Sequence, residues 1–555
     1  MSLSLPLPLD PYAASPGCEQ PFVGREGARV RIAVRAAASI SVPGYGRLLR
    51  ALEELYPVHF VREAAGCDAA ADAVLCLGAS TEARAASGPV FQLAAGEAVC
   101  LPAGEMRFAN HPALPEAVRG LALPDPSCRL ARRLHPGADE EVLADCDGHP
   151  VWLGSRWTPL HFVSALPLPQ LGEHEGLYAY FRPMAWAALL PLLHWLRSIS
   201  QTGWQLPAPR AAIVIDDPNL RHRSYGELNY AQLAAAAEQE NFHAAIATIP
   251  LDAARGGIAA AEVFRQSRGR LSLLVHGNNH TRNELAQRAA AECRRIAAQA
   301  RERMARLEQE GGLKVDRVMA APHGACSGAM ASALAEQGFA AALISVGSLL
   351  RWNPELAGEA TLGMLPAWMW NGLPVMHRHG LRHVRVQAVL SRFLGQAAIF
   401  TAHHQDCGRG LERLREIAWA CNSVAPVQWM STAALARSNF LARQQGTRLE
   451  VRMFAQRASV PLTSLPTQAA VFLPGGESVY CQTGRPGLYL LGAGKVLAAA
   501  VTKASFELEM ITPPVPPVAP AVAWAAPWAR LRRGLCELRD RVAPLLTAAH
   551  PGHLH

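Results

Sequence analysis

Short runs of apolar residues that end in titratable groups recur through the middle of the chain. The run at 211–215 is followed at once by Asp216 and Asp217, and the run at 271–275 is followed by His276. Small and branched apolar residues without polar alternation are typical of strands buried on both faces. Runs of this kind predict strands at 211–215, 243–249, 271–275, 317–321, 341–345, 373–376 and 397–401.

Helical stretches separate several of these strands, most clearly at 283–309. Strands that alternate with helices predict parallel pairing, and seven of them favour a barrel over an open sheet. Titratable groups follow most of the predicted strands, namely Asp216, Asp217, Asp252, His276, His323, His377, Arg378, His379, His403, His404 and Asp406. Because the carboxyl ends of parallel strands gather at one end of a barrel, the pattern predicts a polar site there.

The first part of the chain has a different pattern, which predicts a separate α/β unit over 28–165. Residues 28–36 alternate as a strand, 44–55 are helical, and 58–61 and 73–77 indicate further short strands. This order favours an open, flavodoxin-like or Rossmann-like sheet. No glycine-rich phosphate loop accompanies it, so we assign this unit no chemistry.

The last part of the chain alternates with the period of strands from 447 to 510, which predicts a small β-sandwich-like module. A Pro/Ala-rich linker at 513–527 precedes a short, basic amphipathic helix at 528–546. The expected organisation is therefore a tail at 1–27, an open α/β domain at 28–165, a (β/α) barrel at 166–440, a β module at 441–512, and a linker with a helix at 513–555.

Composition restricts the function classes. Of 555 residues, 50% are hydrophobic and 18% are charged, which suffices for a large core. The net charge of +8 is small for this length and no dense basic block occurs, so we expect no nucleic-acid partner. The 12 cysteines form no CxxC pair, and neither a signal peptide nor a transmembrane run is evident. These features favour a cytoplasmic protein, and they leave the oligomeric state open.

Asp216 and Asp217 repel each other and are costly to bury, unless they share a proton, bind a metal ion or pair with a cation. Alternatively, one carboxylate caps the next segment and the other is exposed. His276 and His280 stand four residues apart at another strand end, and one Asp with two His is an ordinary set for a divalent metal. Residues 281–284 predict a capping box that opens the following helix.

Four motifs, VIDD, HxxxH, AAPHG and IFTAHH, occur in this order. They resemble the motifs of the polysaccharide deacetylases, the NodB-homology group of carbohydrate esterases, over about residues 205–435. The resemblance implies a distorted (β/α)7 barrel. It also implies metal-dependent removal of acetyl groups from an amino sugar or an acetylated glycan.

The resemblance assigns a role to each matching residue. Asp216 corresponds to the catalytic base, whereas Asp217, His276 and His280 correspond to the ligands of one divalent ion, with zinc favoured over cobalt, nickel and manganese. The backbone N–H of His323 corresponds to an oxyanion donor.

A histidine of the pair His403 and His404 corresponds to the catalytic acid. His403 is favoured because it follows the apolar run directly. Residues between the third and fourth motifs are further candidates for contact with substrate, namely Trp368, Trp370, His377 and Arg378. Tryptophans in an apolar run are more often part of the core, and His377 is more often a structural histidine.

Two positions depart from the family pattern. Gly277 stands where the family has Ser or Thr, and Ala320 stands where it has the arginine that orients the base. Arg378 is a possible substitute for that arginine. Two other functions therefore stay open: a non-catalytic carbohydrate-binding protein on a degenerate barrel, and another metal-dependent amidohydrolase.

Overall fold

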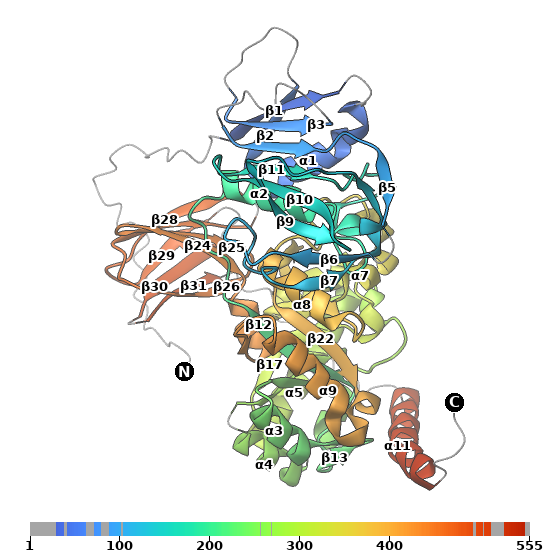
Figure 1. Cartoon of the computed structure of the whole chain (residues 1–555). Helices are drawn as coiled ribbons and strands as arrows, with labels where there is room; N and C mark the ends of the chain where they lie inside the picture. Colours follow the sequence, from blue (N-terminus) through green and yellow to red (C-terminus); the bar gives the residue numbers. More distant parts are fainter. Residues whose placement is uncertain are drawn as a thin grey trace, which may run out of the picture.

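The computed structural model describes residues 29–37, 42–62, 71–78, 88–101, 104–255, 257–267, 269–474, 476–491, 495–502, 504–511 and 527–549. The expected tail at 1–27 and most of the Pro/Ala-rich linker lie outside these residues. The described chain is a mixed α/β structure with several sheets, seen in Figure 1 as an upper blue region, a lower green and yellow region, and a red β module at one side.

The first sheet has the strand order β2-β1-β3-β4-β11-β10-β9-β6-β7. Its strands are β1 (Val30–Ala36), β2 (Val58–Arg62), β3 (Ala73–Leu77), β4 (Val90–Leu93), β6 (Glu105–Phe108), β7 (Ala122–Pro124), β9 (Glu140–Cys146), β10 (His149–Ser155) and β11 (His161–Ser164). Pairing is parallel from β2 to β11 and antiparallel beyond it.

The parallel half of this sheet, with helix α1 (Gly46–Leu55), agrees with the predicted α/β order. The antiparallel half does not, since an open doubly wound sheet continues with further helices. Hairpins replace those helices: β9 and β10 are joined by Asp147 and Gly148, both at positive φ, which is the geometry of a tight turn. Helix α2 (Leu190–Ser200), which follows β11, packs into the same hydrophobic core.

The second sheet has the order β19-β20-β18-β17-β16-β15-β12-β22-β21, with β23 beside β12. Its strands are β12 (Arg210–Asp216), β15 (Ala244–Thr248), β16 (Leu271–His276), β17 (Val315–Ala320), β18 (Ala341–Leu343), β19 (Trp368–Trp370), β20 (Leu373–Met376), β21 (Arg378–His379), β22 (Ala398–His403) and β23 (Gln428–Trp429). All neighbours are parallel except β19 and β20. Each of the seven strands predicted in this region has a counterpart.

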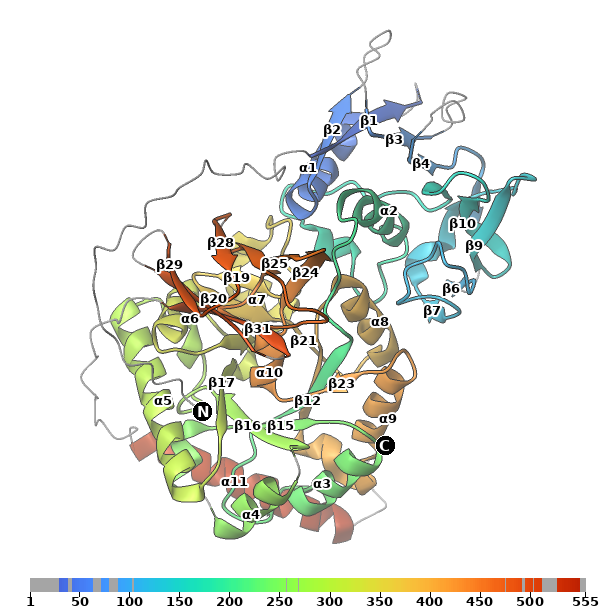
Figure 2. The same ribbon diagram turned by 90° about the vertical axis from the view of Figure 1, so that its left-hand side faces the viewer.

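Alternate residues of the buried strands face two different cores. Ile213 and Ile215 of β12 face one core, whereas Ala212 and Val214 face another. The first core is covered by helices, namely α3 (Tyr230–Gln239), α4 (Ile258–Gln266), α5 (Ala290–Gly311), α6 (Gly328–Glu336) and α9 (Gly408–Asn422). Figure 2 shows α3, α4, α5 and α9 around β12, β15, β16 and β17. Burial on both faces explains why these strands read as unbroken apolar runs.

The C-terminal part forms sheets with the orders β24-β25-β27-β28 and β26-β31-β30-β29, which share one hydrophobic core, as a sandwich does. Their strands are β24 (Phe440–Gln445), β25 (Arg448–Met453), β26 (Arg457–Pro461), β27 (Gln468–Phe472), β28 (Ser478–Gln482), β29 (Gly487–Leu490), β30 (Val496–Val501) and β31 (Ser505–Ile511). The predicted terminal helix is α11 (Pro527–Ala549). Among the described residues, no helix is long and apolar enough to cross a membrane.

A fully buried carboxylate, Asp125, ties the first sheet to the segment before α2. Its Oδ2 accepts hydrogen bonds from the backbone N–H groups of Trp186 and Ala187, both at 2.7 Å. Its Oδ1 accepts the N–H of Ser127 at 2.9 Å. Without the carboxylate, the buried N–H groups of Trp186 and Ala187 have no acceptor, and an unsatisfied buried polar group is costly.

We therefore expect Asp125→Ala to lower the free energy of unfolding by about 2–4 kcal/mol. The midpoint of thermal unfolding measures the effect. The matched control is Asp139→Ala, which removes an exposed carboxylate that accepts from Trp157 Nε1. Equal midpoints for the two variants would contradict the structural role of Asp125.

Candidate metal centre

The end of β12 presents two carboxylates in different ways. Asp216 is the last residue of the strand and is buried. Asp217 follows it with φ at 85°, a conformation that non-glycine residues rarely adopt, and its N–H donates to the carbonyl of Ala247. Backbone strain of this kind is held by the surrounding structure and is frequent at functional sites.

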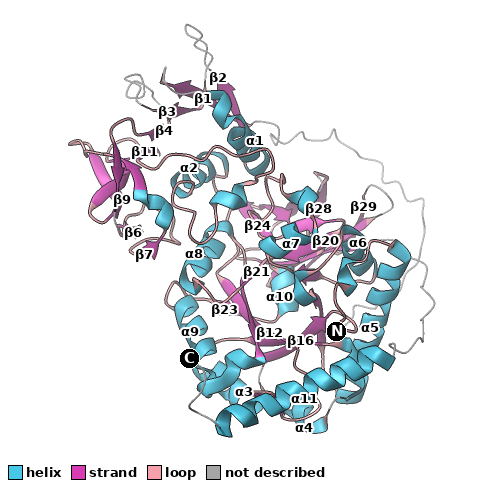
Figure 3. Cartoon of the chain, turned by 90° about the vertical axis from the view of Figure 1, so that its right-hand side faces the viewer, coloured by secondary structure: helices cyan, strands magenta, loops and turns pink. Residues whose placement is uncertain are grey.

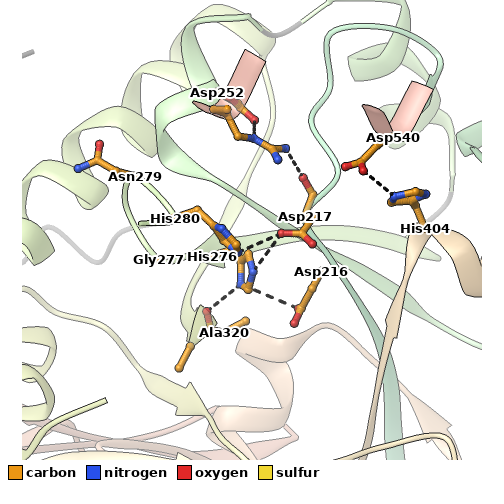
Figure 4. A network of polar contacts seen from close by, with 12 residues as sticks. Asp216, Asp217, Asp252, His276, Gly277, Asn279, His280, Ala320, His404 and Asp540 are labelled. Atoms are coloured by element: carbon orange, nitrogen blue, oxygen red, sulfur yellow. Dashed lines mark hydrogen bonds and ion pairs between the residues drawn. The ribbon is translucent and has the colours of Figure 1, made fainter. Parts of the chain in front are cut away.

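Asp217, His276 and His280 converge on one point. Asp217 Oδ1 lies 3.5 Å from His276 Nε2 and 3.2 Å from His280 Nε2. One potential ligand atom from each residue lies within 4.8 Å of the others. Figure 4 shows the two imidazoles beside the carboxylate of Asp217, with Asp216 below Asp217 and also facing the ring of His276. The structure therefore brings together the three residues that the sequence singled out as metal ligands.

His276 is fixed in the orientation that a ligand needs. Its Nδ1 donates to the carbonyl of Ala320 at 3.0 Å, because a carbonyl oxygen can only accept. When the imidazole is neutral, the Nδ1 proton leaves a lone pair on Nε2, the nitrogen that faces Asp217. A ligand histidine normally makes such a bond through its other nitrogen.

The loop that carries His280 is shaped by Glu284. This buried carboxylate accepts the backbone N–H groups of Asn278 at 2.7 Å, Asn279 at 2.9 Å and His280 at 2.9 Å. Three successive donors around one carboxylate hold the backbone in a tight curve. His280 itself has φ at 55°.

This role of Glu284 corrects two expectations. Residues 281–284 do not cap a helix: a 3₁₀ turn spans Glu284–Ala286, and α5 begins at Ala290 rather than at 283. Gly277 also has a structural reason, since a Cβ there would lie 2.5 Å from Glu284 Oε1 and 2.6 Å from Pro322 Cγ. A serine or threonine does not fit while Glu284 holds the loop.

Asp216 is paired with an arginine from another strand. Arg378 Nη1 donates to Asp216 Oδ2 at 2.7 Å, and Nη2 donates to the carbonyl of Ala321 at 2.9 Å. Both side chains are buried. Arg378, which begins β21, is therefore engaged with Asp216, the residue that the sequence suggested it could orient.

The imidazoles of His276 and His280 lower the pKa of Asp217. Burial by itself raises the pKa of its carboxyl group, but the close polar contact and charge of His276 and His280 lower it well below the usual range. The pKa of His276 is raised in turn: burial opposes its protonation, and Asp216 and Asp217 overcome that effect. Asp217 is thus an anion at neutral pH.

The histidines that end β22 point in different directions. His403 is exposed, and its backbone N–H donates to Asp406 at 2.8 Å. His404 is buried, with Nε2 3.6 Å from Asp540 Oδ1 and its ring 5.4 Å from the ring of Tyr225. The structure therefore turns His404 inward and leaves His403 exposed, whereas the sequence favoured His403 as the acid.

Helix α11 supplies polar partners that the sequence did not reveal. Arg533 donates to Asp252 at 2.6 Å, to the carbonyl of Asp217 at 2.9 Å and to the hydroxyl of Tyr225 at 3.1 Å. Tyr225 donates in turn to Asp540 at 2.8 Å. These contacts link His404 to Asp217 through one continuous network, part of which is drawn in Figure 4.

The same helix reaches the second ligand histidine, because Arg532 donates to the carbonyl of His280. Burial raises the pKa of Asp540, but contacts with His404, Arg539 and Tyr225 lower it to about 2. One signal in the sequence was available. Arg533, Glu537 and Asp540 recur at the spacing of one helix face and are all buried.

The remaining candidate residues divide between the site and the core. His323 has φ at 55° and its ring lies 5.1 Å from that of His280, so it borders the site. Trp368 and Trp370 do not: only 9% and 7% of their surfaces are exposed, and they stack on each other in the core. His377 is also buried, and its Nδ1 donates to the carbonyl of Ile344.

No family model matches the chain, and no curated protein matches it. Among solved structures, a protein from Mycobacterium smegmatis described as a polysaccharide deacetylase is 15% identical, with 42% of this chain and 92% of that chain covered and a TM-score of 0.31. A family 4 carbohydrate esterase from Streptomyces lividans, in complex with acetate, is 15% identical over 39% of this chain and 90% of that chain, with a TM-score of 0.25. A pseudoenzyme of the same esterase family from Bacillus anthracis is 10% identical over 42% and 66% of the two chains, with a TM-score of 0.27. Scores this low give no information about the activity of this chain.

The geometry leads to a prediction about ligands. We expect Asp217→Ala and His276→Ala each to weaken Zn²⁺ binding by more than about 100-fold, since each removes a ligand atom. Asp216→Asn should change the affinity less than about tenfold, because Asp216 is held by Arg378. Competition with a chromophoric chelator measures all three. Equal losses would make Asp216 a ligand.

Proposed function

We propose that the chain is a metal-dependent hydrolase that removes acetyl groups from an amino sugar or an acetylated glycan. The observation that carries the proposal is the cluster of Asp217, His276 and His280 beside a second buried carboxylate, Asp216, which is held by Arg378. A ligand set with an adjacent base is the arrangement that hydrolysis by an activated water requires.

The proposal includes a barrel. Strands β20 and β21 are separated by His377 alone, yet β20 pairs with β18 and β21 pairs with β22, at opposite ends of the strand order. We propose that 373–379 closes a distorted ring of seven parallel strands. Such a ring supports a site built from the carboxyl ends of β12, β16 and β17.

The residues present fit a divalent cation. Asp217 Oδ1 is buried, and no described donor makes a hydrogen bond to it with good geometry, although two imidazole nitrogens approach it. A buried anionic oxygen without a hydrogen bond is costly, and a cation between it and the two nitrogens removes that cost. When bound, the ion makes a water easier to deprotonate and polarises the acyl oxygen.

Asp216 is suited to accept the proton of that water. Arg378 holds its Oδ2, whereas no described donor makes a hydrogen bond to its buried Oδ1. The carboxylate is therefore fixed in direction with one oxygen left to accept. The arginine also balances the buried charge of the base before the proton arrives.

Two further groups act on the acyl carbon and the leaving amine. His323, which follows β17, is proposed to donate its backbone N–H to the oxyanion that forms when water attacks. His404, paired with Asp540, is proposed to carry the proton to the departing amine.

Acetate release from N-acetylglucosamine oligomers tests the proposal, with acetylated xylan as the ester counterpart. We expect release that requires Zn²⁺ and that Asp216→Asn lowers by about 10²–10⁴-fold, because the base is lost while the ligands remain. A chain that binds Zn²⁺ yet releases acetate from neither substrate would contradict deacetylation. It would favour another amidohydrolase or a non-catalytic binding protein.

The role of the acid is tested by replacing His403 and His404, one at a time, with alanine. We expect His404→Ala to lower kcat by about 10²–10³-fold with little change in Zn²⁺ affinity, since a general acid is lost. The matched control, His403→Ala, should stay within about threefold of the parent, because its side chain is exposed. A large loss in the control alone would return the role to His403.

A further inference from the structure

Helix α11 is amphipathic, but it buries its charged face and exposes its apolar face, unlike an ordinary surface helix. Its charged residues Arg533, Glu537 and Asp540 are buried, with exposures of 6%, 4% and 4%. Its large apolar residues face outward instead, namely Trp528 (67% exposed), Leu531 (55%), Leu535 (56%), Leu538 (60%) and Val542 (37%). A surface helix normally buries its apolar stripe, so an exposed apolar stripe indicates a surface that binds a partner.

The outward residues form one continuous band. They are spaced by three and four residues, which places them on a single helix face over about 21 Å. Figure 3 shows α11 across the lower part of the molecule, near α3 and α4. We define these five residues, Trp528, Leu531, Leu535, Leu538 and Val542, as the outer stripe.

The charges around the outer stripe are positive. Helix α11 contains five arginines, and its two acidic residues, Glu537 and Asp540, are both buried. Arg530 and Arg539 are exposed beside the stripe. Arg221 and Arg223, on the loop that receives the end of α11, are exposed as well.

These charges distinguish two possible partners of the outer stripe, namely a second copy of α11 and an anionic lipid surface. In a pair of α11 helices from two copies of the chain, the positions next to the stripe would face each other, and the charged residues there are Arg532, Arg539 and Arg541. Arg539 and Arg541 form ion pairs with Asp540 and Glu537 of the same helix, and the net positive charge that remains on α11 opposes pairing. An anionic lipid surface complements them, and tryptophan and leucine on one face with arginine at the flanks is the composition of an interfacial helix.

We propose that the outer stripe of α11 binds the surface of an anionic membrane. The apolar residues enter the boundary between headgroups and acyl chains, while the flanking arginines contact lipid phosphates. The inner face of α11 keeps its contacts with Asp217, Tyr225 and Asp252, so the bound protein holds the strand-end site close to the lipid surface. This inference does not depend on the reaction that the site performs.

Vesicle flotation of the full-length chain tests the proposal. We expect flotation with phosphatidylcholine vesicles that contain about 30 mol% phosphatidylglycerol, and little with phosphatidylcholine alone. Raising NaCl from about 0.1 to about 0.5 M should weaken binding several-fold, because salt screens the arginines. This second measurement requires no variant.

The double variant L531Q/L538Q should lower the bound fraction about tenfold or more, since it removes apolar surface and keeps the charges. The matched control L488Q/L490Q changes two exposed leucines of β29, and it should bind as the parent does. Zn²⁺ affinity and the thermal midpoint verify that both variants are folded.

Three results would overturn the proposal. One is the absence of flotation with anionic vesicles, and another is equal flotation with neutral and anionic vesicles. The third is a dimer in sedimentation velocity that L531Q/L538Q dissociates, which would assign the stripe to a second copy of the chain.

Discussion

The crowding of two carboxylates at the end of β12 is the constraint on which the site depends. Asp216 ends a strand that is buried throughout and Asp217 follows it, so two adjacent anions repel each other and lose hydration. Arg378 compensates the first, whereas His276 and His280 face the second. Since these partners belong to different elements, the strand end is stable only when the surrounding sheet is assembled.

Helix α11 extends this constraint to the outside of the molecule. Arg533 donates to the carbonyl of Asp217 and pairs with the buried Asp252, so the outer part of the site is completed from a position 316 residues further along the chain. To supply these groups, α11 turns its charged face inward, and its apolar face is left outside. The polar contacts that the site requires therefore explain why the outer stripe of α11 is exposed.

The sequence predicted the strands well where burial on both faces leaves an unbroken apolar run, as in β12 and β16. The prediction from sequence failed where a side chain contacts a group outside the expected local motif. Glu284 fits the pattern of a capping box, yet it accepts three backbone N–H groups of the preceding loop. For Trp368 and Trp370 the sequence left a binding surface and the core both open, and they fill the core. The antiparallel half of the first sheet gave no clear local signal either.

By itself, the sequence determined which strand ends carry Asp217, His276 and His280, because strand burial and the chemical type of a ligand are local properties. Only the tertiary structure decided the partners. Arg378 and Asp216 are 162 residues apart and meet because the strands between them are laid in register. That His404 is buried and His403 is exposed was also decided by the tertiary structure, because an apolar run on both faces hides which parity points inward. His404 points inward because it packs against Tyr225 and Asp540, and no local sequence pattern predicts these contacts.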